Sequence, residues 1–307
     1  MIKENGTGEV WPPLQPDGLI REQLRIVFMG AGRTQSGLAA TVLALANSHG
    51  QLEAQLRPNQ CGNPQYPLTY GDVVAVKASP EQSAQRREHC TPGLTIQRIR
   101  LLDPDEICFE ALLPQTWVAP TQVPALTLLL QSLNAVSHRA IRRFLVDVLL
   151  NANTALGLLT VPASCRHHHA FPGGLLEHTV DMLIDFQQHQ PPTLEPILQD
   201  LMRALIVVHD IGKTVTHASG TYTGRGEWQP HEPAGLELLA SPLAALDRNA
   251  PKLAHFIRAT FKPAQYHPKK RHYLHDWLSR LDRRSASRKP IHVDTLKEPY
   301  HALSDKR

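Results

Sequence analysis

HHHAFPGGLLEH at residues 167–178 and HDIGK at residues 209–213 decide what kind of domain this chain forms. Together they place five histidines and one aspartate in two short segments. The second segment follows an apolar run at 199–208 that has the composition of a buried helix, so His209 and Asp210 come at a helix end. Imidazole and carboxylate groups are ligands that suit divalent transition metals. The two segments therefore predict a metal site.

The order of these motifs resembles that of the HD-domain metal-dependent phosphohydrolases. PAS at residues 162–164, the histidine triplet, GGLLEH and HDIGK are similar to the HD domain of YhaM-type 3′→5′ exoribonucleases. The same motifs resemble the HD-like domain of MobH-type conjugative relaxases. The resemblance covers about residues 130–285. It implies an all-α HD domain with a divalent metal, Mn²⁺ first, and Mg²⁺, Fe²⁺, Ni²⁺ or Co²⁺ as alternatives.

The resemblance also implies a set of metal ligands. His178, His209 and Asp210 match the H…HD pattern, and a buried His-Asp pair without a metal would be costly unless fully hydrogen-bonded. His231 matches a later histidine and is a candidate ligand for a second metal. The late aspartate of the family has two candidates here, Asp282 and Asp276, because a serine occupies the first aspartate position of the D-x-x-D-A motif. The family's later histidine pair is missing as well, so we expect one ion.

Other polar residues of the motifs are candidates for catalysis. Lys213 lies one helical turn beyond the His-Asp doublet, where its charge can neutralise a phosphate oxygen. Three neighbouring histidines in a loop cannot all face one ion, so at most two of them act in the site. We expect His168 and His169 to stabilise charge on the phosphate. On the helix that follows, Asp181 and Asp185 are expected to be ordinary exposed residues.

The N-terminal part of the chain predicts a small β-barrel. Short apolar or alternating runs, separated by turn-forming residues, occur at 24–29, 37–45, 52–56, 70–77 and 94–100. The second run is compatible with a helix, but the NSHG turn after it favours a strand. Several short strands with intervening turns are typical of a small barrel. Their order resembles an OB-fold, which YhaM-type enzymes carry before their HD domain.

Composition along the chain predicts the domain boundaries. Polar, proline-containing residues indicate a flexible N-terminus, and a proline-rich segment separates two folded domains. Apolar spacing predicts helices over 126–136 and 140–159. The expected fold class is α+β, with a small OB-like β-barrel followed by an all-α HD domain. We expect a flexible N-terminus at 1–18, the barrel at 19–113, the linker at 114–125, the HD domain at 126–285 and a basic C-terminal tail at 286–307.

Overall composition limits the class of protein. The 307 residues carry a formal net charge of +4, and a hydrophobic content of 42% is ordinary for a soluble globular protein. No apolar run reaches the roughly 18 residues of a membrane span, and no secretory segment is evident. We therefore expect a cytoplasmic protein that does not bind membranes. The four cysteines form no CxxC pair, which argues against a zinc ribbon or a redox motif.

Positive charge is concentrated in two places that suit a nucleic acid. Basic residues cluster late in the chain, where Lys269, Lys270 and Arg271 are candidates for phosphate contacts; the alternative is a solvated tail. In the barrel, Arg98 and Arg100 share one face of a strand and are candidates for backbone contacts; the alternative is a purely structural barrel. Single-stranded RNA or DNA is the expected partner, and self-assembly is left open.

Four functions are open at this point. The leading one is a metal-dependent phosphodiesterase, a 3′→5′ exonuclease of single-stranded nucleic acid with RNA preferred, in which a metal-activated water attacks the phosphodiester. The second is a MobH-like relaxase or mobile-element protein that processes DNA. The third is a non-catalytic nucleic-acid-binding protein with a degenerate HD site. The fourth is a nucleotide phosphohydrolase, which would not need the barrel.

Overall fold

The computed structural model covers a barrel and a helical domain. The described residues are 12–13, 15–33, 37, 39–56, 67–80, 94–166, 168–261 and 272–287. The predicted phosphate contacts Lys269, Lys270 and Arg271, together with His167 of the histidine triplet, lie outside these ranges. None of the helices within the ranges combines the length and the apolar character needed to cross a membrane.

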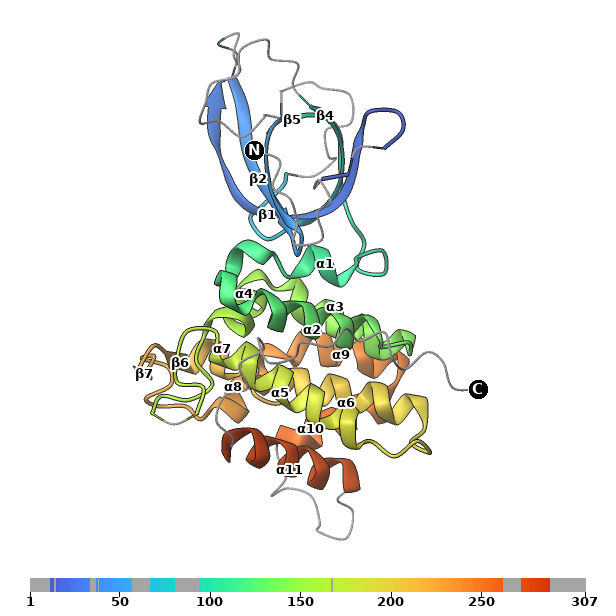
Figure 1. Ribbon diagram of the computed structural model, residues 1–307, viewed down its shortest axis with the longest axis vertical. Helices are drawn as coiled ribbons and strands as arrows, with labels where there is room; N and C mark the ends of the chain where they lie inside the picture. The colour runs from blue at the N-terminus through green and yellow to red at the C-terminus, as the bar shows by residue number, and fades with distance from the viewer. Residues whose placement is uncertain are drawn as a thin grey trace.

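A closed five-stranded barrel forms the N-terminal domain (Figure 1). Its strands are β1 (Ile20–Arg33), β2 (Ala39–Asn47), β3 (Gly50–Leu56), β4 (Val73–Pro80) and β5 (Leu94–Leu101). They are arranged in the order β1-β2-β3-β5-β4, and β4 pairs with β1 to close the barrel. Neighbouring strands are antiparallel, except that β3 and β5 are parallel. The prediction of a small OB-like barrel is therefore confirmed.

Residue alternation decides which side chains fill this barrel. Leu24 and Ile26 on β1 and Val74 and Val76 on β4 are buried in one apolar cluster. Successive side chains of a strand point to opposite faces, so the residues between these point outward. Outward-facing side chains of β1 are consequently available to contact the helical domain.

The second domain is helical. Its α-helices are α1 (Phe109–Leu112), α2 (Val123–Asn134), α3 (Arg139–Leu150), α4 (Ala152–Thr160), α5 (Gly174–His189), α6 (Pro196–Val208), α7 (Lys213–Thr216), α8 (His231–Leu238), α9 (Ala240–Asn249), α10 (Pro251–Phe261) and α11 (Tyr273–Ser287). Two 3-10 turns at Gln115–Trp117 and Pro120–Gln122 and a short hairpin of β6 (His217–Ala218) and β7 (Thr221–Tyr222) complete it. The expected fold class, a barrel followed by a helical domain, is confirmed.

The single helix predicted over 140–159 is wrong, because the chain forms two helices there. Asn151 separates α3 from α4 with an extended backbone (ψ 108°). Its side-chain oxygen accepts a hydrogen bond from the Thr154 amide, which is the usual way in which asparagine caps the start of a helix. The apolar spacing continues across the break, so periodicity alone does not reveal it.

The barrel is anchored to the helical domain by outward-facing residues of β1. Arg25 is fully buried, and its Nη2 donates a hydrogen bond to the Leu149 carbonyl at 2.7 Å. Its guanidinium lies over the Trp117 ring, 5.5 Å from the ring centre. Burial lowers the pKa of Arg25 to about 10, so the group is still charged at neutral pH. Two positions earlier, the Gln23 side chain accepts a hydrogen bond from the Cys108 amide at 2.9 Å.

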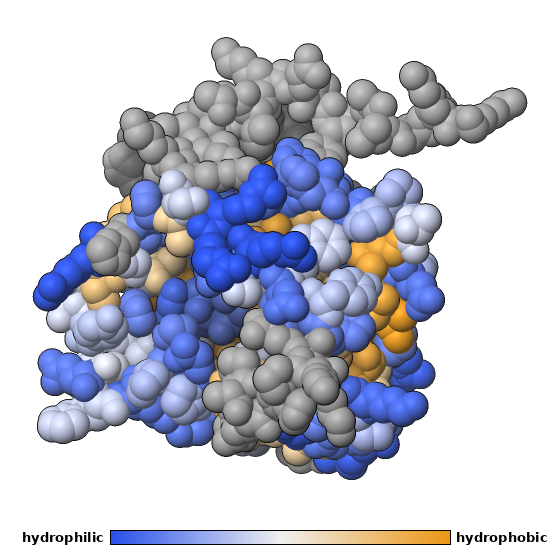
Figure 2. All heavy atoms as spheres, turned by 90° about the horizontal axis from the view of Figure 1, so that it is seen from below, coloured by the Kyte–Doolittle hydropathy of each residue, from blue (hydrophilic) through white to orange (hydrophobic). Residues whose placement is uncertain are grey.

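Helix α5 is the centre of the helical domain. It packs against α2, α4, α6 and α11, so its N-terminal turns are enclosed on several sides. Helix α11 covers it with a strip of buried residues, Leu274, Leu278, Leu281 and Ser285, while Arg280, Arg283 and Arg284 are exposed. The surface on the α11 side is largely hydrophilic, with a smaller apolar strip (Figure 2). This packing brings three separate parts of the chain to one buried point.

Candidate metal centre

Four side chains from three parts of the chain meet at that point. They are His178 on α5, His209 and Asp210 directly after α6, and Asp282 on α11. One ligand atom from each lies within 4.8 Å of all the others. His178 and Asp210 are buried, whereas His209 and Asp282 are partly exposed. The structure thus brings together the four residues for which the sequence predicted a first metal ion, with Asp282 rather than Asp276 as the late carboxylate.

Close backbone contacts fix the start of α5. Gly173 has a φ of 80°, in the left-handed region that glycine adopts without strain. A Cβ on Gly174 would lie 2.0 Å from the His169 carbonyl oxygen, so only glycine allows the histidine loop to lie against the helix. His169 itself has a φ of 57°, which is uncommon for a residue with a side chain. The loop is therefore held in one particular position beside His178.

The two imidazoles are oriented by hydrogen bonds on their far side. His209 Nδ1 donates to the Ile206 carbonyl at 2.8 Å, so its Nε2 is an acceptor. His178 Nδ1 lies 2.9 Å from the Ser285 hydroxyl, which can donate or accept. The two Nε2 atoms face each other at 3.3 Å. Outer hydrogen bonds of this kind orient histidine ligands in metal sites.

The carboxylates complete a mixed nitrogen and oxygen donor set. Asp282 Oδ1 lies 3.4 Å from His178 Nε2, and Asp210 Oδ2 lies 3.3 Å from His209 Nε2. Donor atoms bound about 2.1 Å from one ion are themselves separated by roughly 3–4 Å. Two imidazoles with two carboxylates suit a borderline transition metal. The residues present therefore fit a single divalent ion.

Electrostatics favour the metal-binding protonation states of Asp210 and His178 but oppose that of His209. Burial alone would raise the pKa of Asp210, but the charges of His209 and Lys213 outweigh it and hold the pKa well below its usual value. Burial lowers the pKa of His178, which favours neutral imidazole. Burial would also lower the pKa of His209, but the Asp210 carboxylate raises it instead. An ionised aspartate and a neutral histidine are the forms that bind metals.

Lys213 and His231 contact the two oxygens of Asp210. Lys213 Nζ lies 2.5 Å from Asp210 Oδ2, and His231 Nε2 lies 3.1 Å from Asp210 Oδ1. The contact with His231 depends on Gly212, because a Cβ there would lie 1.8 Å from the His231 carbonyl oxygen. His231 therefore lies beside the four-residue group without belonging to it. A second ion bound at His231 stays a prediction.

The described residues of the histidine triplet differ in burial, and the aspartates of α5 differ from their predicted exposure. His168 is exposed and lines a cleft, whereas His169 is buried 3.4 Å from an oxygen of Asp181. The expectation that Asp181 and Asp185 are exposed is wrong, because both are buried. Their helix is covered on several sides, and Arg284 of α11 lies 3.2 Å from Asp185. The roles predicted for His168 and His169 stay predictions.

Two clefts reach the metal-binding group from different sides. One, of about 730 Å³, is lined by His178, Lys213 and the segment 226–232. The other, of about 680 Å³, is lined by His209, Asp210 and side chains of α10 and α11. Asp282 and His231 line both. The first cleft is lined by His178 and Asp282 of the four donors, and the second by His209, Asp210 and Asp282, so the group lies between the two clefts.

Three site residues were not found from the sequence. Ser285, which orients His178, lies three residues after Asp282, so helical spacing on α11 could have indicated it. His217 is buried beside the first cleft, and burial, together with the charges of Lys213 and His231, lowers its pKa to about 4. Trp228 is 89% exposed at the same cleft. Neither of the last two carries a sequence signal beyond its residue type.

Comparisons with known proteins give one partial match. No family model matches the chain, and no solved structure matches it. The chain is 36% identical over 118 residues to the 3′-5′ exoribonuclease YhaM of Oceanobacillus iheyensis. The match covers 36% of this chain and 36% of that protein. The matched part is thus about a third of the curated relative's length, and it supports a nuclease function only in general terms.

Proposed function

We propose that this protein is a metal-dependent phosphodiesterase that shortens single-stranded RNA from its 3′ end. The observation that carries the proposal is the meeting of His178, His209, Asp210 and Asp282 within 4.8 Å at the edge of two clefts. The partial similarity to an exoribonuclease supports the choice of substrate. The closed barrel in front of the helical domain supports an extended substrate over a free nucleotide, because it offers a second surface for binding.

The four residues would hold a divalent ion, for which Mn²⁺ is our first choice. When bound, such an ion lowers the pKa of a coordinated water and stabilises negative charge on phosphate. Lys213 brings a positive charge to the same cleft, where it can bind a non-bridging phosphate oxygen. His168 on the cleft wall can donate a hydrogen bond to the same phosphate or to its neighbour.

Trp228 supports a substrate that contains bases. Its side chain is 89% exposed at the first cleft, where an indole gains nothing from packing within the chain. Stacking of a base on an aromatic ring contributes about 1–3 kcal/mol and tolerates any sequence. We therefore assign Trp228 to hold the terminal base, and we expect Trp228→Ala to raise KM roughly tenfold or more with little change in kcat. A fall in kcat alone would remove this role.

A catalytic centre is favoured over a degenerate one by the position of Asp282. The non-catalytic hypothesis rests on the late ligands of the family motif that are missing here, the histidine pair and the first aspartate. Asp282 Oδ1 lies 3.4 Å from His178 Nε2, so a fourth donor is present. Moreover, burial would raise the pKa of Asp282, but the hydrogen bond from His178 together with the charges of His209 and His178 lowers it, so the carboxylate is ionised at neutral pH.

The test is cleavage of 5′-labelled single-stranded RNA and DNA in Mn²⁺. Wild-type protein is expected to give a ladder of RNA products that shorten stepwise from the 3′ end. The variant His209→Ala/Asp210→Ala should give no products and bind no Mn²⁺, while its circular dichroism spectrum stays that of the wild type. Equal cleavage by this variant would refute the proposed centre. Site-specific nicking of DNA without trimming of RNA would favour the relaxase hypothesis instead.

A further inference from the structure

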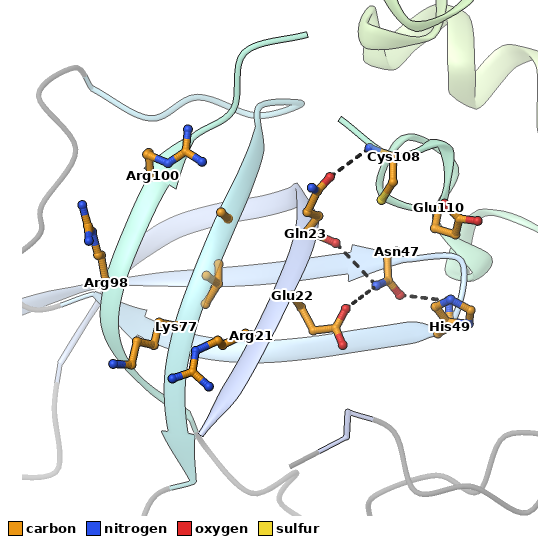
Figure 3. A pocket seen from close by; sticks show the side chains of 12 residues that line it. Arg21, Glu22, Gln23, Asn47, His49, Lys77, Arg98, Arg100, Cys108 and Glu110 are labelled. Atoms are coloured by element: carbon orange, nitrogen blue, oxygen red, sulfur yellow. Dashed lines mark hydrogen bonds between the residues drawn. The ribbon is translucent and has the colours of Figure 1, made fainter. Parts of the chain in front are cut away.

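A row of three positive side chains crosses the outer surface of the barrel. Arg21 on β1 pairs in register with Lys77 on β4, and Lys77 pairs with Arg98 on β5. Ile20, Val76, Ala78 and Ile99 next to them in these strands fill the barrel core, so the three cations point outward together. Figure 3 shows them on one side of a pocket, with Arg100 farther along β5. We call Arg21, Lys77 and Arg98 the cation row.

The cation row is only partly neutralised by the protein itself. Arg21 forms an ion pair with Asp17, and Arg100 forms one with Glu106 at 2.7 Å. Within the described residues, neither Lys77 nor Arg98 forms an ion pair. Like charges directly opposite each other on adjacent strands destabilise a sheet. An anionic ligand would remove that repulsion.

The usual ligand face of an OB-fold is not suited to an anion in this protein. That face is formed by the second and third strands. Here the residues that point away from the barrel core are Val42, Ala44 and Ala46 on β2, of which the two alanines are buried, and they pair in register with Gln55, Glu53 and Gln51 on β3. Among these described positions there is no cation, and the one charged residue is acidic. The positive charge lies instead across β1, β4 and β5.

The cation row borders a hollow large enough for part of a polymer. The pocket has a volume of about 660 Å³ and extends from Arg98 and Lys77 to Cys108 and Glu110 at the start of the helical domain. Strands are about 4.8 Å apart, so three adjacent strands carry the row over roughly 10 Å. This length exceeds a single phosphate group and suits consecutive phosphates of one strand.

We propose that the cation row binds the phosphodiester backbone of single-stranded nucleic acid. The site would hold the body of the strand while its 3′ end lies at the metal centre. The placement of the 3′ end at the metal centre rests on the proposed function, whereas binding of the strand to the cation row does not. Arg21 and Lys77 thereby join Arg98 in one site that could be defined only from the strand register.

The experiment measures binding without cleavage. Fluorescence anisotropy of a labelled single-stranded RNA is recorded in EDTA at several salt concentrations, for wild type and for Lys77→Gln/Arg98→Gln. The control is Arg248→Gln/Lys252→Gln, which removes the same charge from α9 and α10, at exposed positions outside all three clefts. Unfolding midpoints show that both double variants are folded.

We expect the row variant to raise Kd roughly tenfold and to make the slope of log K against log salt shallower by about 1.4. The control should bind like wild type. Equal Kd and equal slope for the row variant and the control would overturn the proposal. Because EDTA prevents metal-dependent cleavage, the result is decisive even if the protein proves to have no nuclease activity.

Discussion

The Nε2 atoms of His178 and His209 face each other at 3.3 Å although the residues are 31 positions apart in the chain. When His209 is neutral, its Nε2 is an acceptor, so His178 Nε2 carries the proton of the hydrogen bond between the two rings. Binding of an ion requires that proton to be on His178 Nδ1 instead, from which the Ser285 hydroxyl oxygen can accept a hydrogen bond. Ser285 is therefore the residue that allows His178 to change between these two forms.

Replacing Ser285 should weaken metal binding without removing a ligand. We expect Ser285→Ala to lower the affinity for Mn²⁺ about 10- to 100-fold, because His178 loses the partner of its far nitrogen. Isothermal titration calorimetry of the metal-free protein measures this directly. Ser287→Ala on the same helix is the control, since its hydroxyl donates to the Arg284 carbonyl at the surface. Equal affinities for the two variants would contradict the role of Ser285.

Replacing Lys213 should lower the turnover rate more than it lowers the affinity for the metal ion. Lys213→Met removes the charge beside Asp210, and we expect kcat to fall about 10²–10³-fold while the ion still binds. Single-turnover cleavage at saturating Mn²⁺ separates the two effects. Lys252→Met, an exposed lysine of α10, provides the matched control. Unchanged cleavage by Lys213→Met would show that the phosphate is bound by other groups.

Gly212 is expected to tolerate no side chain. A Cβ there would lie 1.8 Å from the His231 carbonyl oxygen, so Gly212→Ala must displace the start of α8. We expect a loss of about 1–3 kcal/mol in the free energy of unfolding, measured with urea. Gly224→Ala is the control, because a Cβ at that position meets nothing within 4 Å. The same stability for both variants would mean that α8 is not packed as described.

Arg25 should stabilise the domain junction mainly through its volume. Arg25→Ala leaves a cavity and takes the donor away from the Leu149 carbonyl, so we expect a loss of about 2–4 kcal/mol. Arg25→Met keeps most of the volume and removes a buried charge, and its loss should be below about 1.5 kcal/mol. Urea unfolding compares the two. An equal loss would show that the charge itself holds the junction.

Cys108 should react as a thiol of unusually high pKa. Burial raises the pKa of Cys108 to about 11, so at pH 8 its thiolate fraction is roughly a hundredfold below that of an ordinary thiol. Alkylation by iodoacetamide, followed on the Cys108 peptide by mass spectrometry, should rise about tenfold per pH unit between pH 7 and pH 10. The alkylation rate of glutathione in the same tube should level off above the pKa of its own thiol. A Cys108 rate that levels off near pH 9 would contradict the burial.

The sequence predicted the fold class because its signals are local. Alternation and turns indicated the strands, and the NSHG turn correctly favoured a strand before residue 47. The break at Asn151 was missed because the apolar spacing runs through it. The parallel pairing of β3 with β5 closes the barrel through contacts between distant parts of the chain, which no local pattern contains.

The site residues that belong to a short sequence motif could be predicted. The residues that only the packing of helices brings to the site could not. His178, His209 and Asp210 follow from two motifs, but Asp282 and Asp276 differ only in the face of α11 on which each lies. The structure places Asp282 in the group and leaves Asp276 exposed. The cation row was missed for a related reason, because strand register decides which residues are neighbours.

The place of α11 in the chain has a consequence during translation. Its Asp282 and Ser285 join His178, which is synthesised about a hundred residues earlier, and His209, which is synthesised about 70 residues earlier. While the ribosome is still making residues 273–287, the barrel and α5 can already fold, but the donor set is incomplete. The proposed nuclease would thus become active only after residues 273–287 have been synthesised, so a growing chain that lacks them cannot yet cleave the messenger RNA to which it is tethered.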